Sequence, residues 1–285
     1  MFWRSTFFSL LACTLIAASN GTIFHAKAEQ STSRNVTFAS AVYPPTPFQI
    51  RRAKALGRKA PLTAGQRLVG RLTRPGGNGP FAAVVLMHGC HGIGAWNRIW
   101  SARLVSWGYA VLDVDGFGPR GHASVCVRPT VVAGPTRALD AHGAARFLSK
   151  QTFIDGNRIA VMGMSHGGWS TLNAINHETT ERLRLPSFRA AVALYPWCEG
   201  PAILDAPLLI AAAARDDWTP AQKCRAFVKR VRTDHVLALK IYPEAHHMFD
   251  VPGLDKIQFN HVIRHDPKAE ADVIERVRAF LAQHL

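Results

Sequence analysis

Residues 163–168 read GMSHGG, and Ser165 in this stretch follows the apolar run RIAVM and precedes the helix-like segment WSTLNAI. A G-x-S-x-G sequence between a buried strand and a helix is typical of the nucleophile elbow, a tight turn that exposes a serine hydroxyl. Gly163 and Gly167 have no side chains, so the strand and the helix can approach closely around a strained turn. The backbone N–H of His166 would then lie at a helix N-terminus, facing the place where an oxyanion forms. The alternative is an ordinary glycine-rich turn in which Ser165 caps the helix.

The chain on both sides of this turn alternates strand-like and helix-like segments. Continuous apolar runs predict buried strands, and apolar residues at helical spacing predict the helices between them. The predicted strands are 66–74, 81–89, 109–115, 158–164, 190–196, 206–214 and 236–242, and the predicted helices are 97–107, 136–150, 166–177, 219–231 and 268–284. This alternation predicts an α/β fold with a parallel sheet and helices on both faces. Together with the elbow at Ser165, it makes an α/β-hydrolase fold with a mostly parallel central sheet the expected architecture. No linker or repeat divides residues 48–285, which we expect to form a single domain.

A serine hydroxyl needs a base, and the base needs an acid to orient it. In α/β-hydrolases these groups follow the serine in the order acid, then histidine. Asp216 and Asp217 follow one predicted strand, and His246 and His247 follow a later one, at the sheet edge expected for Ser165. The residues alone do not choose within either pair.

The turn MHGCHG, residues 87–92, begins within the last residues of the apolar strand 81–89. Turns at this position commonly supply the second N–H of an oxyanion hole. The backbone amides of Cys90 and His166 are therefore the predicted oxyanion donors, and we expect the side chains of His88 and His91 to be packed within the turn.

The first 28 residues have the features of a secretory signal peptide. Arg4 precedes an apolar run, and Ala26 and Ala28 stand at the −3 and −1 positions of a cleavage site. We therefore expect an exported protein, periplasmic or secreted, with residues 29–47 as a loosely held N-terminal arm. A retained N-terminal anchor is the main alternative, and lipidation at Cys13 is a weaker one.

Composition excludes a disordered chain, because 48% of residues are hydrophobic and 19% are charged. The net charge is +15, and it becomes +13 if residues 1–28 are removed, because Arg4 and Lys27 are lost with no acid. Such a charge suits anionic partners. However, the densest basic runs, RRAK at 51–54 and KRVR at 229–232, lack interleaved aromatics, so no nucleic-acid partner is expected. We expect a small-molecule substrate and no stable membrane insertion after signal cleavage.

Four cysteines remain after Cys13 is removed: Cys90, Cys126, Cys198 and Cys224. An even number of cysteines in an oxidising compartment indicates two disulfides. The sequence allows three pairings, and four free thiols are the alternative.

The histidines His261 and His265 stand four residues apart, but without a nearby acid cluster they are weak evidence for a metal site. We therefore expect no metal site and no cofactor.

The chain resembles the dienelactone hydrolase family of α/β-hydrolases, in its exported branch with a serine nucleophile. The resemblance spans about residues 80–285 and is carried by VVLMHGCHGIGAW, WGYAVLDVDGFGPRG, FIDGNRIAVMGMSHGGW, PLLIAAAARDDWTP and YPEAHHMFD. The family's D-x-x-x-P turn implies Asp216 as the acid, and its A-x-H-x-F sequence implies His247 as the base. The family's strand order implies the disulfides Cys90–Cys126 and Cys198–Cys224.

The chain also departs from the family's namesakes. Those enzymes use a cysteine nucleophile with a nearby glutamate, and an arginine four residues after the histidine holds the substrate carboxylate. Here these positions hold Ser165, a turn without an acid, and Val251. The resemblance therefore implies a serine hydrolase of a carboxylic ester or lactone, and a substrate with a carboxylate is disfavoured. Alternatives are a serine peptidase or amidase of the same fold and a non-catalytic, anion-binding scaffold. Arg120 is a candidate contact for an anionic substrate group, or a loop arginine tied to Asp115 or a carbonyl.

Overall fold

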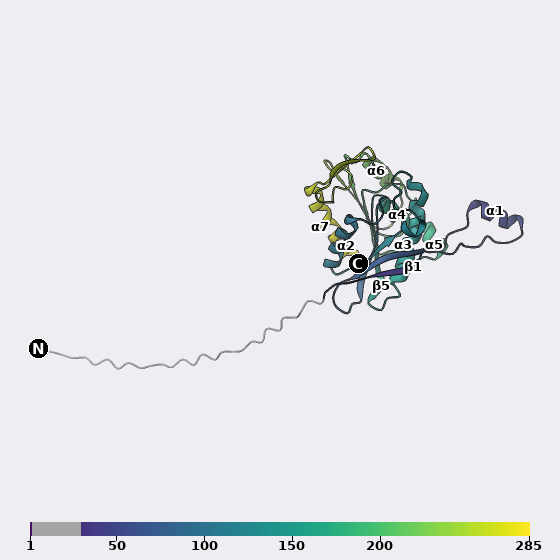
Figure 1. Cartoon of the computed structure of the whole chain (residues 1–285), viewed down its shortest axis with the longest axis horizontal. Coiled ribbons are helices and arrows are strands. Elements are labelled where there is room, and N and C mark those ends of the chain that lie inside the picture. The colour runs from purple at the N-terminus through teal and green to yellow at the C-terminus, as the bar shows by residue number, and fades with distance from the viewer. Residues whose placement is uncertain (2–29) are drawn as a thin grey trace.

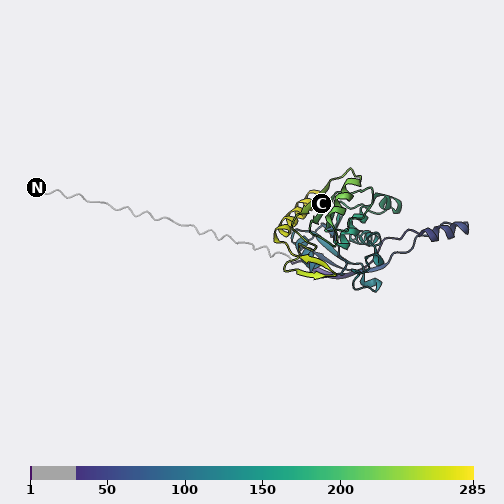
Figure 2. The ribbon, with the colours of Figure 1, turned by 90° about the horizontal axis from the view of Figure 1, so that it is seen from above.

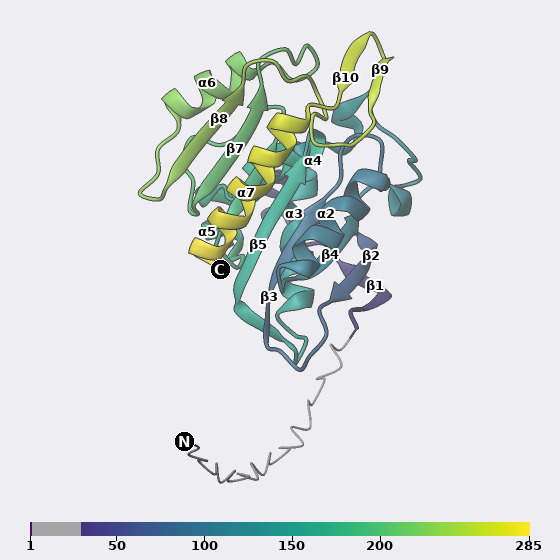
Figure 3. The ribbon, with the colours of Figure 1, turned by 90° about the vertical axis from the view of Figure 1, so that its left-hand side faces the viewer.

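A computed structural model describes Met1 and residues 30–285 of the chain. Its centre is an eight-stranded sheet in the order β1-β2-β4-β3-β5-β6-β7-β8 (Figure 3). Strand β2 pairs antiparallel with both of its neighbours, β1 and β4, and all other neighbouring strands pair parallel. The strands are β1 (Thr32–Ala39), β2 (Arg67–Arg74), β3 (Phe81–Met87), β4 (Ala110–Asp115), β5 (Ile154–Met164), β6 (Ala191–Leu194), β7 (Leu208–Ala213) and β8 (Leu237–Tyr242).

Helices cover both faces of this sheet, as Figure 3 shows for the face turned to the viewer. On that face lie α2 (Ala95–Ser106) and α7 (Pro267–His284), whose apolar residues pack with one core cluster. The other face is covered by α3 (Gly134–Leu148), α4 (His166–Ala174) and α6 (Ala221–Arg230). The remaining elements are α1 (Pro47–Ala55), α5 (His177–Leu183), the short 3-10 helices Gly118–Arg120 and Pro129–Val132, and the hairpin β9 (Asp255–Gln258) and β10 (His261–Arg264).

The central strands are apolar throughout because both of their faces are buried. In β3, Ala83, Val85 and Met87 pack against the cluster that contains α3 and α4. Val84 and Leu86 point the other way, into the cluster that contains α2 and α7. A strand buried on both sides does not alternate in polarity, which is why the continuous run 81–89 predicted its place. The α/β-hydrolase-type architecture is confirmed.

The N-terminal part of the described chain differs from the expected loose arm. Within residues 29–47, Thr32–Ala39 form β1, which pairs antiparallel with β2 at the edge of the sheet. Val36 and Phe38 alternate with exposed residues and turn inward, and the Phe38 ring lies 5.7 Å from that of Phe147 on α3. Burial of these two side chains outweighs the polar composition that suggested a loose segment.

The predicted signal peptide, residues 1–28, lies outside the described residues apart from Met1. Among the residues that the structure describes, no helix has both the length and the apolar character needed to span a bilayer.

Two disulfides link segments of the chain that follow neighbouring strands. Cys90 is bonded to Cys126, and Cys198 is bonded to Cys224. The first bond joins the segments after β3 and β4, and the second joins the segment after β6 to helix α6. Both pairs agree with the pairing that the family resemblance implied.

Candidate active site

Ser165 lies between β5 and α4 in a backbone conformation that few residues other than glycine adopt, with φ 55° and ψ −116°. Both flanking glycines are required by close contacts. A Cβ on Gly163 would lie 2.2 Å from the carbonyl oxygen of Gly167, and one on Gly167 would lie 2.0 Å from that of Met87. The elbow predicted from GMSHGG is therefore a strained turn whose neighbours leave no room for a side chain.

The hydroxyl of Ser165 lies beside an imidazole and, through it, beside a carboxylate. Ser165 Oγ is 3.0 Å from His247 Nε2, and His247 Nδ1 is 2.6 Å from Asp216 Oδ2. Ser165 follows β5, His247 follows β8 and Asp216 follows β7. The three residues meet at the edge of the sheet where the parallel strands end. His247 and Asp216 are almost fully buried. Of the pairs that the residues left open, His247 and Asp216 are thus the members within reach of Ser165.

A set of hydrogen bonds fixes the carboxylate of Asp216. Its Oδ1 accepts from the backbone N–H groups of Trp218 and Thr219 at 2.9 and 2.8 Å, and its Oδ2 accepts from Thr219 Oγ1 at 2.8 Å. Burial alone would raise the pKa of Asp216. The nearby His247 and these bonds outweigh burial, so the pKa of Asp216 is lowered and the group stays ionised.

The other members of the two pairs are less buried, because Asp217 is exposed and His246 is partly exposed. Asp217 sits 3.4 Å from His261 Nδ1. His261 belongs to β10 and stacks on Trp218, whereas His265 Nε2 lies 2.6 Å from Glu270. The spacing of His261 and His265 therefore does not place them on one helix face.

The turn after β3 packs directly against the elbow. A Cβ on Gly89 would lie 3.6 Å from Ser165 Cβ, so the Cys90 amide lies near the nucleophile. The His166 amide is in the first turn of α4, where N–H groups have no partner within the helix. These two amides are the predicted oxyanion donors, and both belong to segments that contact Ser165.

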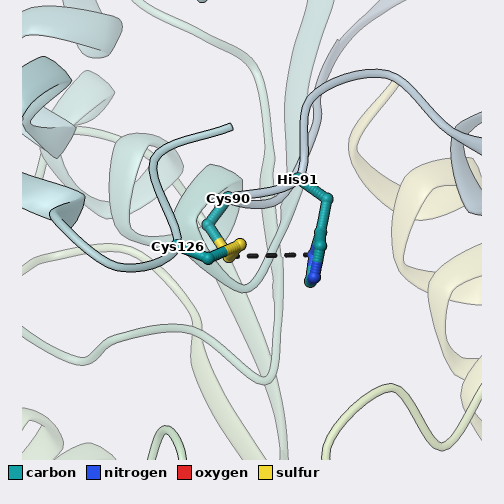
Figure 4. Close-up of side chains that lie close together, drawn as sticks. All are labelled: Cys90, His91 and Cys126. Atoms are coloured by element: carbon teal, nitrogen blue, oxygen red, sulfur yellow. Dashed lines mark hydrogen bonds between the residues drawn. A yellow bond between two sulfur atoms is a disulfide. The ribbon is translucent and has the colours of Figure 1, made fainter. Parts of the chain in front are cut away.

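The Cys90–Cys126 disulfide lies at this turn, with His91 beside it (Figure 4). Cys90 Sγ is 3.7 Å from His91 Nδ1. Within the described residues, Cys90, His91 and Cys126 form a cluster with metal-ligand atoms within 4.8 Å of one another. Metals bind thiolates, and both sulfurs here are in the disulfide, so the cluster offers only the imidazole of His91.

Arg137 of α3 lies fully buried behind the elbow and contacts both turns. Its Nη1 donates to the backbone carbonyl of His88 at 2.7 Å and lies 3.2 Å from His166 Nδ1. His166 Nε2 lies 2.9 Å from the carbonyl of Pro129. Burial and the Arg137 charge lower the pKa of His166 to about 3, so its ring is neutral, with Nδ1 accepting and Nε2 donating.

Arg120 forms an ion pair with Asp140 within the fold. Its guanidinium makes two 2.8 Å bonds to the carboxylate of Asp140, and it also donates to Tyr43 Oη and to the carbonyl of Gly116, both at 2.6 Å. The expected contact with a carbonyl is present at Gly116, but the carboxylate partner is Asp140 and not Asp115. Arg120 does not line the cavity next to Ser165, so the geometry favours its role as a tied loop arginine.

A small cavity of about 110 Å³ opens beside Ser165. Three indole rings and the Cys90–Cys126 disulfide form much of its wall, and Glu199 is the one acid among its lining residues. The residues that line it are Cys90, Cys126, Pro129, Thr130, Ser165, His166, Trp169, Trp197, Glu199, Trp218 and Thr219. A larger open cleft of about 750 Å³, next to α5, contains none of the residues grouped around Ser165 and is not the candidate site.

A mostly parallel sheet, a nucleophile elbow and a hydrogen-bonded Ser–His–Asp arrangement together define an α/β-hydrolase. Residues 68–285 match the family model described as the dienelactone hydrolase family, and the chain belongs to that family. It is therefore a hydrolase of the type that acts on esters and lactones.

Known relatives agree with this assignment. A Bradyrhizobium protein named probable 2-oxo-3-(5-oxofuran-2-ylidene)propanoate lactonase is 24% identical over 66% of this chain and 81% of its own length. Among solved structures, a dienelactone hydrolase-like promiscuous phosphotriesterase from metagenomic libraries has a TM-score of 0.63 and 17% identity, over 90% of this chain and 99% of its own. A dienelactone hydrolase from Anabaena variabilis has a TM-score of 0.57 and 20% identity, over 77% of this chain and 93% of its own. At these identities the structures support the fold.

Proposed function

We propose that the protein is a serine hydrolase that cleaves a carboxylic ester or lactone through an acyl-enzyme on Ser165. The observation that carries this proposal is the continuous pair of hydrogen bonds from Ser165 Oγ to His247 Nε2 and from His247 Nδ1 to Asp216 Oδ2, at 3.0 and 2.6 Å. A serine at an elbow without such a base would be a poor nucleophile near neutral pH.

In this mechanism His247 takes the proton of Ser165 as Oγ attacks the carbonyl carbon. Asp216 holds the imidazole in the tautomer that leaves Nε2 free to accept, and it stabilises the charged imidazolium. The oxyanion accepts hydrogen bonds from the backbone amides of Cys90 and His166, where loss of one donor typically costs about 3–4 kcal/mol. His247 then protonates the leaving alcohol, and water hydrolyses the acyl-enzyme.

The cavity favours a neutral acyl group. Its wall is mainly aromatic, its histidine His166 is neutral, and its one charged residue, Glu199, is negative. Glu199 Oε1 is 3.4 Å from Lys223 Nζ, and both side chains are about half-exposed, so this pair provides little attraction for an anion. The Bradyrhizobium relative is named for a lactone that carries a propanoate group. We propose that the present site instead prefers esters or lactones without a carboxylate.

A fluorophosphonate probe tests the nucleophile. We expect the folded protein to become labelled at Ser165, and Ser165→Ala and His247→Ala to remain unlabelled while keeping the wild-type melting temperature. Folded wild type that takes no label would instead support a non-catalytic, anion-binding scaffold. Comparing p-nitrophenyl esters with aminoacyl anilides separates an esterase from a peptidase.

A matched pair of substrates tests the acyl preference. p-Nitrophenyl butyrate and the p-nitrophenyl monoester of succinate have the same acyl chain length and differ by one carboxylate. We expect kcat/KM to be at least tenfold higher for the butyrate, and Glu199→Gln to narrow the difference. Equal or faster cleavage of the succinate ester would show that the site accepts anions, while leaving the serine mechanism intact.

We also propose that residues 1–28 direct export. The two disulfides fit an oxidising compartment. Mass spectrometry of protein recovered from the envelope and medium of an expressing cell should find a mature chain beginning at Glu29, and an N-terminus at Met1 would indicate a retained segment.

A further inference from the structure

Residues 44–62, here called the α1 segment, leave the body of the molecule and return to it. Figures 1 and 2, seen at right angles, both show α1 projecting away from the sheet and its covering helices. Tyr43 and Thr63 close the base of the segment, where each backbone N–H donates to the other's carbonyl at 3.1 and 3.0 Å. The projection is therefore anchored at its ends.

Local interactions form the helix, but it lacks tertiary packing. Thr46 and Gln49 make a reciprocal capping box, and Pro47 occupies the first turn. Every residue from 46 to 59 is exposed except Ala53. A nine-residue helix is marginal in water without packing. We therefore expect the α1 segment to be stabilised when it binds a surface outside this chain.

The chemistry of the segment limits what that surface can be. It exposes four large apolar side chains by half or more: Phe48, Ile50, Leu56 and Leu62. It also has five cations and no acid: Arg51, Arg52, Lys54, Arg58 and Lys59. Residues 30–112 contain no Asp or Glu at all.

The apolar and basic side chains are interleaved. Arg51 and Arg52 stand three and four residues after Phe48, and Lys54 stands four residues after Ile50, so each apolar side chain on the helix neighbours a cation. Long basic side chains can keep their charge in a polar layer while nearby apolar groups enter a less polar one.

We propose that the α1 segment binds the surface of a lipid bilayer that carries anionic headgroups. A second copy of this chain is disfavoured as the partner, because the net charge of +15 opposes the contact. Nucleic acid would use the cations but leave the four apolar side chains in water. A bilayer interface accommodates both, and the fold then holds the hydrolase at the membrane without a spanning helix.

Vesicle flotation tests this proposal with the purified protein. We expect binding to vesicles of phosphatidylcholine with phosphatidylglycerol, weak binding to phosphatidylcholine alone, and a steep loss of binding as salt is raised. A cation near an anionic surface contributes about a fivefold gain in partition. The double variant Arg51→Gln/Arg52→Gln should therefore bind about 25-fold more weakly, and Phe48→Ser/Leu56→Ser should also lose at least about tenfold.

The matched control is Arg225→Gln/Lys229→Gln, which removes two exposed cations from α6 and lowers the net charge equally. It should keep binding within about twofold to threefold, since the proposal assigns binding to one segment. Circular dichroism and melting temperature should be the same for all variants. The proposal is overturned if the α6 variant loses as much binding as the α1 variants, or if the α1 variants bind like wild type. It is also overturned if the α1 substitutions abolish a dimer or duplex-DNA binding while vesicle binding is absent.

Discussion

The hydroxyl of Thr219 connects the proposed acid and base to the end of strand β6. Its Oγ1 lies 2.8 Å from Asp216 Oδ2 and 3.2 Å from His247 Nδ1, and it also contacts the carbonyl of Tyr195 at 3.0 Å. The hydroxyl does not touch Ser165 Oγ, so we treat Thr219 as a positioning residue. Its role is to keep the carboxylate aligned with the imidazole inside a buried site.

Thr219→Val keeps the shape of this side chain and removes its hydroxyl. A buried hydrogen bond to a charged group is worth about 1.5–3 kcal/mol, and Asp216 keeps its other partners. We expect kcat on a neutral ester to fall roughly tenfold to 100-fold with KM nearly unchanged. Thr219→Ser restores the hydroxyl and should recover most of the loss. If kcat is unchanged in the valine variant, the positioning role is refuted.

At the residue scale, the sequence predicted the groups that belong to a motif. Ser165, Asp216 and His247 each lie at a strand end inside a recognisable stretch, and the structure brings all three together. Thr219 is in the same RDDWTP stretch, but only the aspartates and the proline carried a signal. No sequence signal indicated a role for Arg137. Its burial results from the packing of α3 behind the elbow, a long-range contact that the local sequence TRALD does not encode.

At the scale of a single strand, β4 contains a buried acid that the proposed mechanism does not use. Asp113 is 5% exposed and lies against Ser101 and Asn97 of α2. Burial raises the pKa of Asp113 from 3.8 to about 7, against smaller opposing effects of those two side chains and of Arg71. The folded state therefore holds a proton on Asp113 over a pH range in which the unfolded chain has lost it.

This shift predicts how stability depends on pH. Between about pH 4 and 7 the unfolded state releases the proton of Asp113 more readily than the folded state, so this group lowers stability as pH rises. At about 1.4 kcal/mol per pKa unit, the loss is roughly 2–4 kcal/mol and is complete above pH 7. Asp113→Asn removes the titration. Urea unfolding of both proteins should show the variant gaining stability relative to wild type from pH 4 to pH 8, and a constant difference would contradict the prediction.

At the element scale, the sequence predicted the strands and helices that carry strong periodic or continuous apolar signals. The strands β3, β5 and β7 were recognisable because both of their faces are buried. Strand β1 was missed because only Val36 and Phe38 alternate inward, within a polar segment. The β9–β10 hairpin was missed for a similar reason, since its one fully buried residue is Ile263 and its turn uses Phe259 and Asn260 at positive φ without a glycine.

At the scale of the whole molecule, the two disulfides brace different parts of the same sheet edge. Cys90–Cys126 closes a loop between residues 36 apart and lines the cavity beside Ser165. Cys198–Cys224 closes a loop between residues 26 apart and joins the segment after β6 to α6, and neither sulfur lines that cavity. The bonds therefore differ in their distance from the proposed chemistry while constraining loops of similar length.

Paired substitutions separate these two roles. Loops of these lengths correspond to about 3–4 kcal/mol of loop-closure stabilisation for either disulfide, so Cys90→Ser/Cys126→Ser and Cys198→Ser/Cys224→Ser should lower the melting temperature by similar amounts, on the order of 10 °C. At 20 °C, where both variants are folded, only the first should lose activity, because the Cys90 amide is a proposed oxyanion donor held by its disulfide to the loop at 116–135. We expect kcat/KM for p-nitrophenyl butyrate to fall at least tenfold in that variant and less than twofold in the other. Equal losses of kcat/KM in the two variants would mean that general destabilisation of the fold, and not the position of the Cys90 turn, lowers the activity.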